Sequence, residues 1–317
     1  MPRNGGGTDQ ALLARQGRRT LTSDPVYRRS LLQIHFCVVL WGFTAILGRL
    51  ISLPAFGLVW WRMVLVVAGA ALLPRTWRGL QAMDRRAVVI YSGIGVLVAL
   101  HWLTFYGSIK LANASVAATC MGVAPVFIAV LEPLLLRTRF ERSDLLIGVL
   151  AIPGVGLVVG GTPTGMRLGI VAGLVSAALV ALFGALNKRY GTSGEPLAVT
   201  CLELAAGTAF LTLVALAAPG LAGGLPTLPG SHDAVLLVIL ALACTLLPFS
   251  LSLVALRHLS AFSVQLAVSL EPVYAIVLAI LLLGEQRELG LAFYAGVAII
   301  LGSVFGHTAI KLRSRPL

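Results

Sequence analysis

The 317-residue chain is 58% hydrophobic and only 11% charged, and its mean hydropathy is +0.95. Soluble domains carry about 25% charged residues, so a soluble enzyme with this composition could not hide its apolar surface. The net charge of +12 does not indicate nucleic-acid binding, because the basic residues stand between apolar runs and do not cluster with stacking aromatics on one solvated face. The composition is typical of an integral membrane protein.

The first thirty residues contain six arginines and no apolar core, so they do not form a cleavable signal peptide. We expect residues 1–30 to be a disordered cytoplasmic tail. The four cysteines lie inside apolar runs, without a CxxC pair or a histidine at metal spacing, and are expected to be core residues: Cys37, Cys120, Cys201 and Cys244.

Ten apolar runs follow, each close to the roughly 20 residues that a helix needs to cross a bilayer. They predict transmembrane helices over residues 31–50, 55–73, 87–109, 115–136, 145–161, 168–186, 196–218, 234–256, 261–283 and 289–308. Lysine and arginine gather in cytoplasmic loops. With the N-terminus inside, nineteen of the 24 basic residues lie in inner segments and four in outer loops. We therefore predict a multi-pass plasma-membrane protein with both termini cytoplasmic, residues 309–317 forming the C-terminal tail.

The chain repeats itself at a shift of 147 residues, which places residues 110–136 on residues 257–283. Pro125 then falls on Pro272, and a triple leucine falls on a triple leucine. Because each half holds five helices, an odd number, the second half is inserted upside down, as in many transporters with a midplane site. The predicted fold is all-α, with two inverted five-helix repeats at residues 31–161 and 168–308, a linker at 162–167, and a central cavity.

Four segments are similar to a known family: WGFTAILGRLI from Trp41, WWRM from Trp60, the third and fourth predicted helices (TFYGSIKLANASVAA and APVFIAVLEPLLL), and SLEPVYAIVLAILLLGE from Ser269. They resemble the EamA-type transporters of the drug/metabolite transporter superfamily. The resemblance covers Leu31 to Thr308 and implies export or uptake of small metabolites, often amino acids or related compounds.

One position departs from the family pattern. The family commonly shows Gly-Glu after the leucine run of each half, as Gly284 and Glu285 do in the second half here. The first half has Arg137 and Thr138 instead. A role carried by that glutamate therefore transfers only to Glu285.

Four strongly ionisable side chains fall within the predicted spans: Arg62, Glu132, Glu203 and Glu271. A charge at mid-bilayer costs at least about 2.5 to 3.5 kcal/mol, so each needs a reason. Glu271 lies at the centre of the ninth helix beside Pro272, which invites a kink. It is the first candidate for binding solute or coupling protons, although a neutral, purely structural glutamate would also explain its position.

The other three charges lie nearer the membrane surfaces. Glu132 is within about a turn of the inner end of the fourth helix, where neighbouring arginines favour a structural role. Arg62 and Glu203 occupy matched places in the two halves, and inversion puts Arg62 toward the outside and Glu203 toward the inside. We expect each to snorkel to its interface or to guard an entrance, and the two not to be partners.

Aromatic and polar side chains predict the wall of one cavity for a zwitterionic or amphipathic solute. The third helix carries His101, Trp102 and Tyr106 on one broad face, at i, i+4 spacing. A lipid-facing or packed stripe would show the same pattern. The remaining predicted wall residues lie on the first and ninth helices: Trp41, Thr44, Gln265, Glu271 and Tyr274.

Two glycine patterns, GLVVG over 156–160 and GSVFG over 302–306, end the fifth and tenth helices. GxxxG spacing permits close helix contact, either inside one protomer or across a homodimer.

No phosphate loop, HExxH or GxSxG motif occurs, so we expect no cofactor, no metal and no enzymatic activity. The prediction is a secondary transporter, proton-coupled or facilitative, with export favoured over uptake. Two alternatives remain. An intramembrane enzyme acting on lipids would need clustered catalytic groups, and a channel or scaffold would more naturally show symmetric polar rings, whereas Glu271 aligns with Ala124.

Overall fold

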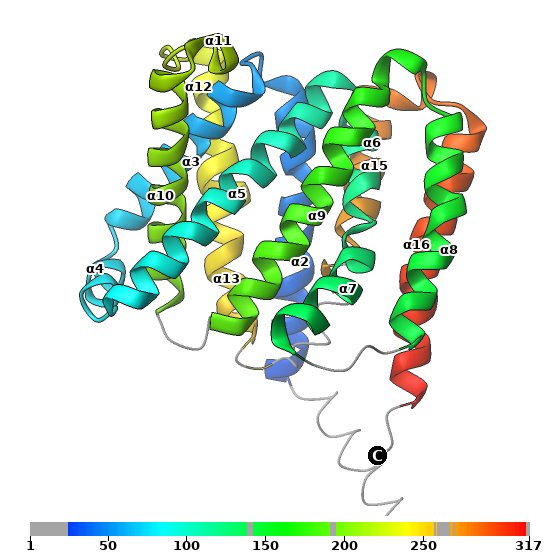
Figure 1. The fold of residues 1–317 in the computed structure, drawn as a ribbon, viewed down its shortest axis with the longest axis horizontal. Helices are drawn as coiled ribbons and strands as arrows, with labels where there is room; N and C mark the ends of the chain where they lie inside the picture. Colours follow the sequence, from blue (N-terminus) through cyan, green and yellow to red (C-terminus); the bar gives the residue numbers. More distant parts are fainter. Residues whose placement is uncertain are drawn as a thin grey trace, which may run out of the picture.

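A computed structural model of the chain describes residues 25–137, 142–190, 195–256, 258, 267–268 and 270–314, and every regular element among them is helical. The helices pack side by side in one bundle (Figure 1). In the described ranges, five helices are long and apolar enough to cross a membrane, or six if one bent pair counts as a span, and four shorter apolar helices accompany them. Large apolar side chains such as Leu72, Ile152, Leu168 and Leu291 are exposed, as contact with lipid requires. The chain is a multi-pass membrane protein.

The first half contains seven described helices: α2 (Pro25–Leu50), α3 (Ala55–Ala71), α4 (Pro74–Gln81), α5 (Arg85–Leu111), α6 (Ala114–Met121), α7 (Ala124–Leu136) and α8 (Arg142–Gly160). Helix α2 begins six residues before the predicted span, inside the segment expected to be disordered. Helix α4 was not predicted, and it bends 91° away from α3. The bend follows from Pro74, because the residue before a proline avoids helical backbone and Leu73 is extended here.

The second half contains η1 (Thr164–Met166), α9 (Arg167–Tyr190), α10 (Pro196–Ala217), α11 (Pro219–Ala222), α12 (Ser231–Val238), the π-helix η2 (Ile239–Leu246), α13 (Leu247–Leu256), α15 (Glu271–Leu283), η3 (Glu285–Arg287) and α16 (Leu291–Ser314). Helix α16 continues into the predicted C-terminal tail. Residues 1–24 of the predicted N-terminal tail lie outside the described residues.

Matched prolines mark a helix start in both halves. The predicted fourth helix is two helices, α6 and α7, and Pro125 lies in the first turn of α7. In the ninth predicted helix, α15 begins at Glu271 with Pro272 in its first turn. A proline suits this place because the first N–H groups of a helix have no partner within it. Both prolines thus start a half-helix near mid-span, where the sequence predicted two continuous helices, with a kink only at Pro272.

Helices α5 and α10 touch backbone to backbone. A Cβ on Gly95 would lie 2.0 Å from the Glu203 carbonyl oxygen, and one on Gly207 would lie 2.7 Å from the Gly95 carbonyl oxygen. Side chains larger than hydrogen are therefore excluded from this seam.

We expect Gly95→Ala to lower the thermal midpoint of the purified protein in detergent, because the new methyl group must push α5 and α10 apart. The matched control is Gly93→Ala in the same helix, where a Cβ meets nothing within 4 Å. This control should leave the midpoint unchanged or raise it, since alanine favours helix by up to about 1 kcal/mol over glycine. Equal midpoints for the two variants would contradict the close contact.

Helices α8 and α16 pair along one edge of the bundle (Figure 1). The contact uses Gly154 and Gly296, where a Cβ on Gly296 would lie 2.5 Å from the Gly154 carbonyl oxygen. It also uses Gly161, whose carbonyl accepts a 3.0 Å hydrogen bond from the Gly290 N–H. The predicted glycines behave differently: a Cβ on Gly156, Gly160, Gly302 or Gly306 meets nothing within 4 Å. Of the two possibilities that the GxxxG spacing left open, these four glycines do not make a close helix contact inside one protomer.

Candidate functional site

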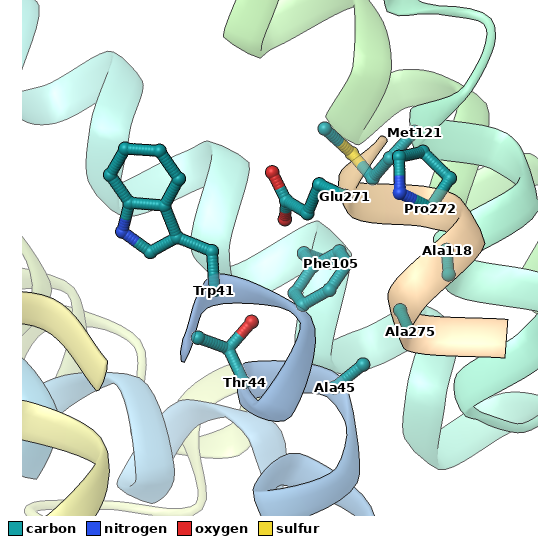
Figure 2. Close-up of a pocket in the computed structure, with 9 residues that line it drawn as sticks. All are labelled: Trp41, Thr44, Ala45, Phe105, Ala118, Met121, Glu271, Pro272 and Ala275. Carbon is teal, nitrogen blue, oxygen red and sulfur yellow. The ribbon is translucent and has the colours of Figure 1, made fainter. Parts of the chain in front are cut away.

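A small pocket lies where α2, α5, α6 and α15 meet (Figure 2). Its lining residues are Trp41, Thr44, Ala45, Phe105, Ala118, Met121, Glu271, Pro272 and Ala275. The volume of about 10 Å³ is room for about one water molecule. A metabolite could enter only if these helices moved apart.

Glu271 is the one ionisable group in the lining of this pocket. It is the first residue of α15, and Figure 2 shows its carboxylate pointing into the space near Trp41 and Phe105. A helix N-terminus carries a partial positive charge that favours an anion there. Within the described residues, the carboxylate has no hydrogen-bond partner and no ion pair. A cationic group in the pocket would lie beside this carboxylate.

Arg62, on α3, lies beside this pocket, and its side chain reaches between α5 and the π-helix η2. It is 5% exposed. Its Nε and Nη2 donate to the Thr245 hydroxyl at 3.1 and 2.9 Å, and its Nη1 donates to the Tyr106 hydroxyl at 2.8 Å. The guanidinium carbon sits 3.7 Å from the centre of the Trp102 ring, a cation–π contact.

The π-helix explains how Thr245 reaches Arg62. The Thr245 hydroxyl donates to the Leu240 carbonyl, five residues earlier, at 2.7 Å. Its oxygen lone pairs are then left to accept both guanidinium hydrogen bonds. Such wide turns occur often at functional sites, and here the wide turn holds an acceptor against a buried cation.

Arg62 has no carboxylate partner within ion-pair distance in the described ranges. Its charge and that of Glu271 attract each other electrostatically, but no direct contact joins them. The Tyr106 hydroxyl connects the two regions, because it accepts from Arg62 and lies 3.5 Å from the Thr44 carbonyl in the pocket wall. Among the described residues, a buried guanidinium without a carboxylate partner and a carboxylate without a cationic partner thus lie on the two sides of Tyr106 and Thr44.

Five of the eight predicted wall residues lie at the pocket or beside it, in two groups. Trp41, Thr44 and Glu271 line the pocket, and Trp102 and Tyr106 hold Arg62 beside it. Arg62, expected near an outer entrance, therefore lies among the predicted cavity residues.

Two other predicted wall residues, His101 and Tyr274, do not line the pocket. His101 faces α9, where its Nδ1 lies 2.8 Å from the Ser176 hydroxyl, and its ring packs against Phe183. Tyr274 packs against α2 at Gly42, where a Cβ would lie 3.2 Å from the Tyr274 Cβ. Gln265 lies outside the described residues.

The two remaining predicted charges lie away from the pocket lining. Glu132 is half-buried on α7, and Glu203 is buried on α10. Neither belongs to the wall of the pocket.

Two residues of the site could hardly be recognised from the sequence. Thr245 stands 183 positions from Arg62, and nothing in the surrounding apolar run distinguishes it from other threonines. Met121 reaches the pocket because α6 ends there. The matched proline at position 125 was the one feature that could have located this break.

At the end of the helix bundle that is predicted to face outside, Glu285 joins the two repeats. It is 1% exposed. Its Oε1 accepts from the Ala114 N–H at 3.0 Å and its Oε2 accepts from the Ser115 N–H at 2.7 Å, so it caps the first turn of α6. The Asn113 side chain caps the same helix through the Val116 N–H and donates to Glu288 at 3.0 Å.

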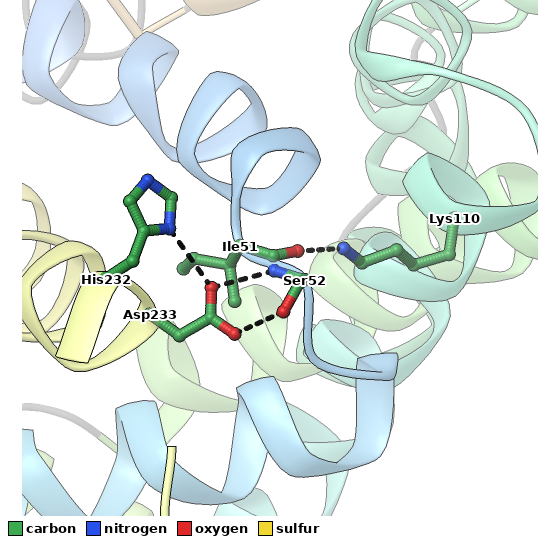
Figure 3. Close-up of polar contacts among 5 residues, drawn as sticks. All are labelled: Ile51, Ser52, Lys110, His232 and Asp233. Atoms are coloured by element: carbon green, nitrogen blue, oxygen red, sulfur yellow. Dashed lines mark hydrogen bonds and ion pairs between the residues drawn. The ribbon is translucent and has the colours of Figure 1, made fainter. Parts of the chain in front are cut away.

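A second contact closes the same end of the bundle (Figure 3). Asp233 accepts from the Ser52 N–H at 2.9 Å and from the Ser52 hydroxyl at 2.5 Å. Lys110 donates to the Ile51 carbonyl. The loop after α2 is therefore held by groups from both halves of the chain.

Comparison with known proteins gives a family and a fold. Residues 28–160 and 167–308 each match the model of the EamA-like transporter family. A solved crystal structure, described only as that of a protein, covers 91% of this chain and 99% of its own, with a TM-score of 0.61 and 16% identity. At this identity the likeness shows the fold alone. No protein of curated function matches the chain.

Proposed function

This chain belongs to the EamA-like transporter family, and from that premise we propose that it is a secondary transporter for a zwitterionic metabolite. The solute class is an amino acid or a related compound, and export across the plasma membrane is the favoured direction. Transport proceeds by alternating access and is coupled to protons at Glu271.

The observation that carries the proposal is a pair of opposite charges that have no ion-pair partner among the residues that the structure describes. Burying a cation in the membrane is expensive without a partner, yet Arg62 has only hydroxyl and aromatic partners in the described ranges. A solute carboxylate would supply the missing anion, and its ammonium group would meet Glu271. Trp102 and Phe105 would face the remainder of the solute.

Alternating access is supported by the closed pocket and by the half-helices around it. Transporters commonly place their sites at broken helices between inverted repeats, and α6, α7 and α15 have this form. The proposed topology is ten helices with both termini cytoplasmic. In its favour, the start of α2 and the end of α16 lie at the same end of the bundle (Figure 1).

The first test uses purified protein in liposomes loaded with radiolabelled amino acids and related metabolites, with and without a pH gradient. We expect Glu271→Gln to abolish the stimulation by the gradient while sparing counterflow, because the amide keeps the shape of the side chain but cannot release a proton. Glu195→Gln, which removes a carboxylate at the start of α10, should behave like wild type.

Each outcome of this test has a distinct meaning. Unchanged gradient dependence in Glu271→Gln would remove proton coupling from Glu271 but leave transport in place. Failure of the wild type to move any solute of the panel would count against transport of amino acids and would favour a scaffold or a lipid-modifying role.

A further inference from the structure

A second buried carboxylate, Glu203, lies apart from the pocket. It is 7% exposed on α10. The backbone of α5 approaches its carbonyl so closely that a Cβ on Gly95 would lie 2.0 Å away. Glu203 therefore sits at a tight helix seam and does not face lipid.

The polar surroundings of Glu203 are incomplete. The Asn187 side chain, from α9, hydrogen-bonds to the carboxylate. Glu203 Oε1 and Asn187 Oδ1 are both buried and have no hydrogen-bond partner. With Oε1 and Oδ1 unused, the Asn187 amide nitrogen and Glu203 Oε2 are the atoms left to make this contact. Two acceptor oxygens on adjoining side chains are left without a donor, and buried polar atoms are normally satisfied.

No other described group supplies that donor. Tyr91, the titratable group on α5 that interacts with Glu203, donates its hydroxyl to the Tyr190 carbonyl at 2.8 Å. On α9, Arg189 donates to the Leu135 carbonyl at 2.6 Å. Among the described residues, no charged side chain on the helices packed against α10 makes an ion pair with Glu203. These side chains are Arg62 on α3, Arg75 and Arg78 on α4, and Arg85, Arg86 and Lys110 on α5.

We infer that Glu203 and Asn187 form a proton-binding site. A carboxyl group and a primary amide can close two hydrogen bonds at once, N–H to oxygen and O–H to oxygen. One proton added to Glu203 Oε1 is donated to Asn187 Oδ1, so both orphan oxygens are satisfied together. The proton comes from water on the inner side and returns to water when it leaves.

The number of oxygens favours a proton over a metal ion. Hard cations such as Ca²⁺ and Mg²⁺ take six or more oxygen ligands, and only two unsatisfied oxygens are present here. In the described part of the chain, no group of three or more His, Cys, Asp or Glu side chains could hold a metal.

Loss of the proton has a structural consequence. The ionised carboxylate would be left buried with an unpaired oxygen, which is costly unless water reaches it. Release is therefore linked to opening of the seam between α5, α9 and α10. Proton binding stands independently of the proposed function, whereas a role for Glu203 in driving transport rests on that function.

The test is an infrared pH titration of the full-length purified protein in lipid nanodiscs, which follows the C=O stretch of protonated carboxyl groups. We expect wild type to show a band that Glu203→Gln lacks, because a glutamine has no carboxyl group. Asn187→Leu should retain the band at a shifted frequency, since the hydrogen-bond partner is gone. Glu195→Gln, on the same helix, should leave the band unchanged.

Several outcomes would overturn the site. The band could persist in Glu203→Gln, or keep its frequency in Asn187→Leu. It could also vanish at constant pH when sodium replaces choline, which would make the site a sodium site. Asn187→Leu retains the carboxyl group, so the proposal stays testable even if Glu203→Gln fails to fold. Counterflow measured in parallel separates the two proposals: a titrating band without wild-type transport would refute the function alone.

Discussion

Replacing Arg62 with methionine is expected to weaken binding of an amino acid by about 10-fold to 100-fold, because a hydrogen bond to a charged group contributes about 1.5 to 3 kcal/mol. The same variant should bind the corresponding amine, which lacks the carboxylate, as well as wild type does. Arg62→Lys keeps the charge but cannot lie flat on Trp102 while donating to both Thr245 and Tyr106, so an intermediate loss is expected.

These affinities are measured by equilibrium binding of radiolabelled amino acids and their matching amines to detergent-solubilised protein. Size-exclusion chromatography controls for folding of each variant. If Arg62→Met weakened binding of the amino acid and binding of the amine equally, Arg62 would be a structural residue. The assignment of a zwitterionic solute would then fail. The comparison is sharp because the two ligands differ only in the group that Arg62 is proposed to bind.

Removal of the Glu285 side chain is the second large effect. Glu285→Ala leaves the Ala114 and Ser115 N–H groups buried without acceptors, and each such group costs about 1 to 3 kcal/mol. We therefore expect a loss of about 2 to 6 kcal/mol and a clear fall in the thermal midpoint in detergent. Loss of a negative charge at the start of α6 adds to this effect.

Glu288→Ala is the matched control for Glu285→Ala. Glu288 lies three residues after Glu285 and contacts Asn113, the residue before α6. Unlike that of Glu285, its side chain is exposed. Water can replace the exposed Glu288 carboxylate as the acceptor of the Asn113 amide, so Glu288→Ala should cost about 1 kcal/mol or less, below the loss expected for Glu285→Ala. A thermal midpoint for Glu285→Ala as high as that of Glu288→Ala would contradict the role of Glu285 as the cap that joins the repeats.

The candidate site shows which parts of the molecule were predictable. Glu271, Trp41 and Thr44 were found because a carboxylate and polar groups at mid-span are rare enough to stand out. The place of Arg62 was not predicted, since inversion symmetry indicates depth in the membrane and not which neighbours a side chain meets. His101 shares a helix with Tyr106 but faces Ser176. Successive residues are rotated by about 100° around a helix, so a broad stripe of side chains contacts two neighbouring helices.

By itself the sequence determined that this is a membrane protein of two related halves with apolar spans, and it predicted a kink at Pro272 but no break at Pro125. Hydropathy, loop charge and proline chemistry are local properties that need no knowledge of neighbours. Only the tertiary structure decided which helix faces meet: Arg62 on Thr245, Glu285 on α6, and Glu203 on Asn187. The first two pairs join residues 183 and 171 positions apart in the chain. In all three, helix rotation and packing, which the local pattern does not encode, set the contacts.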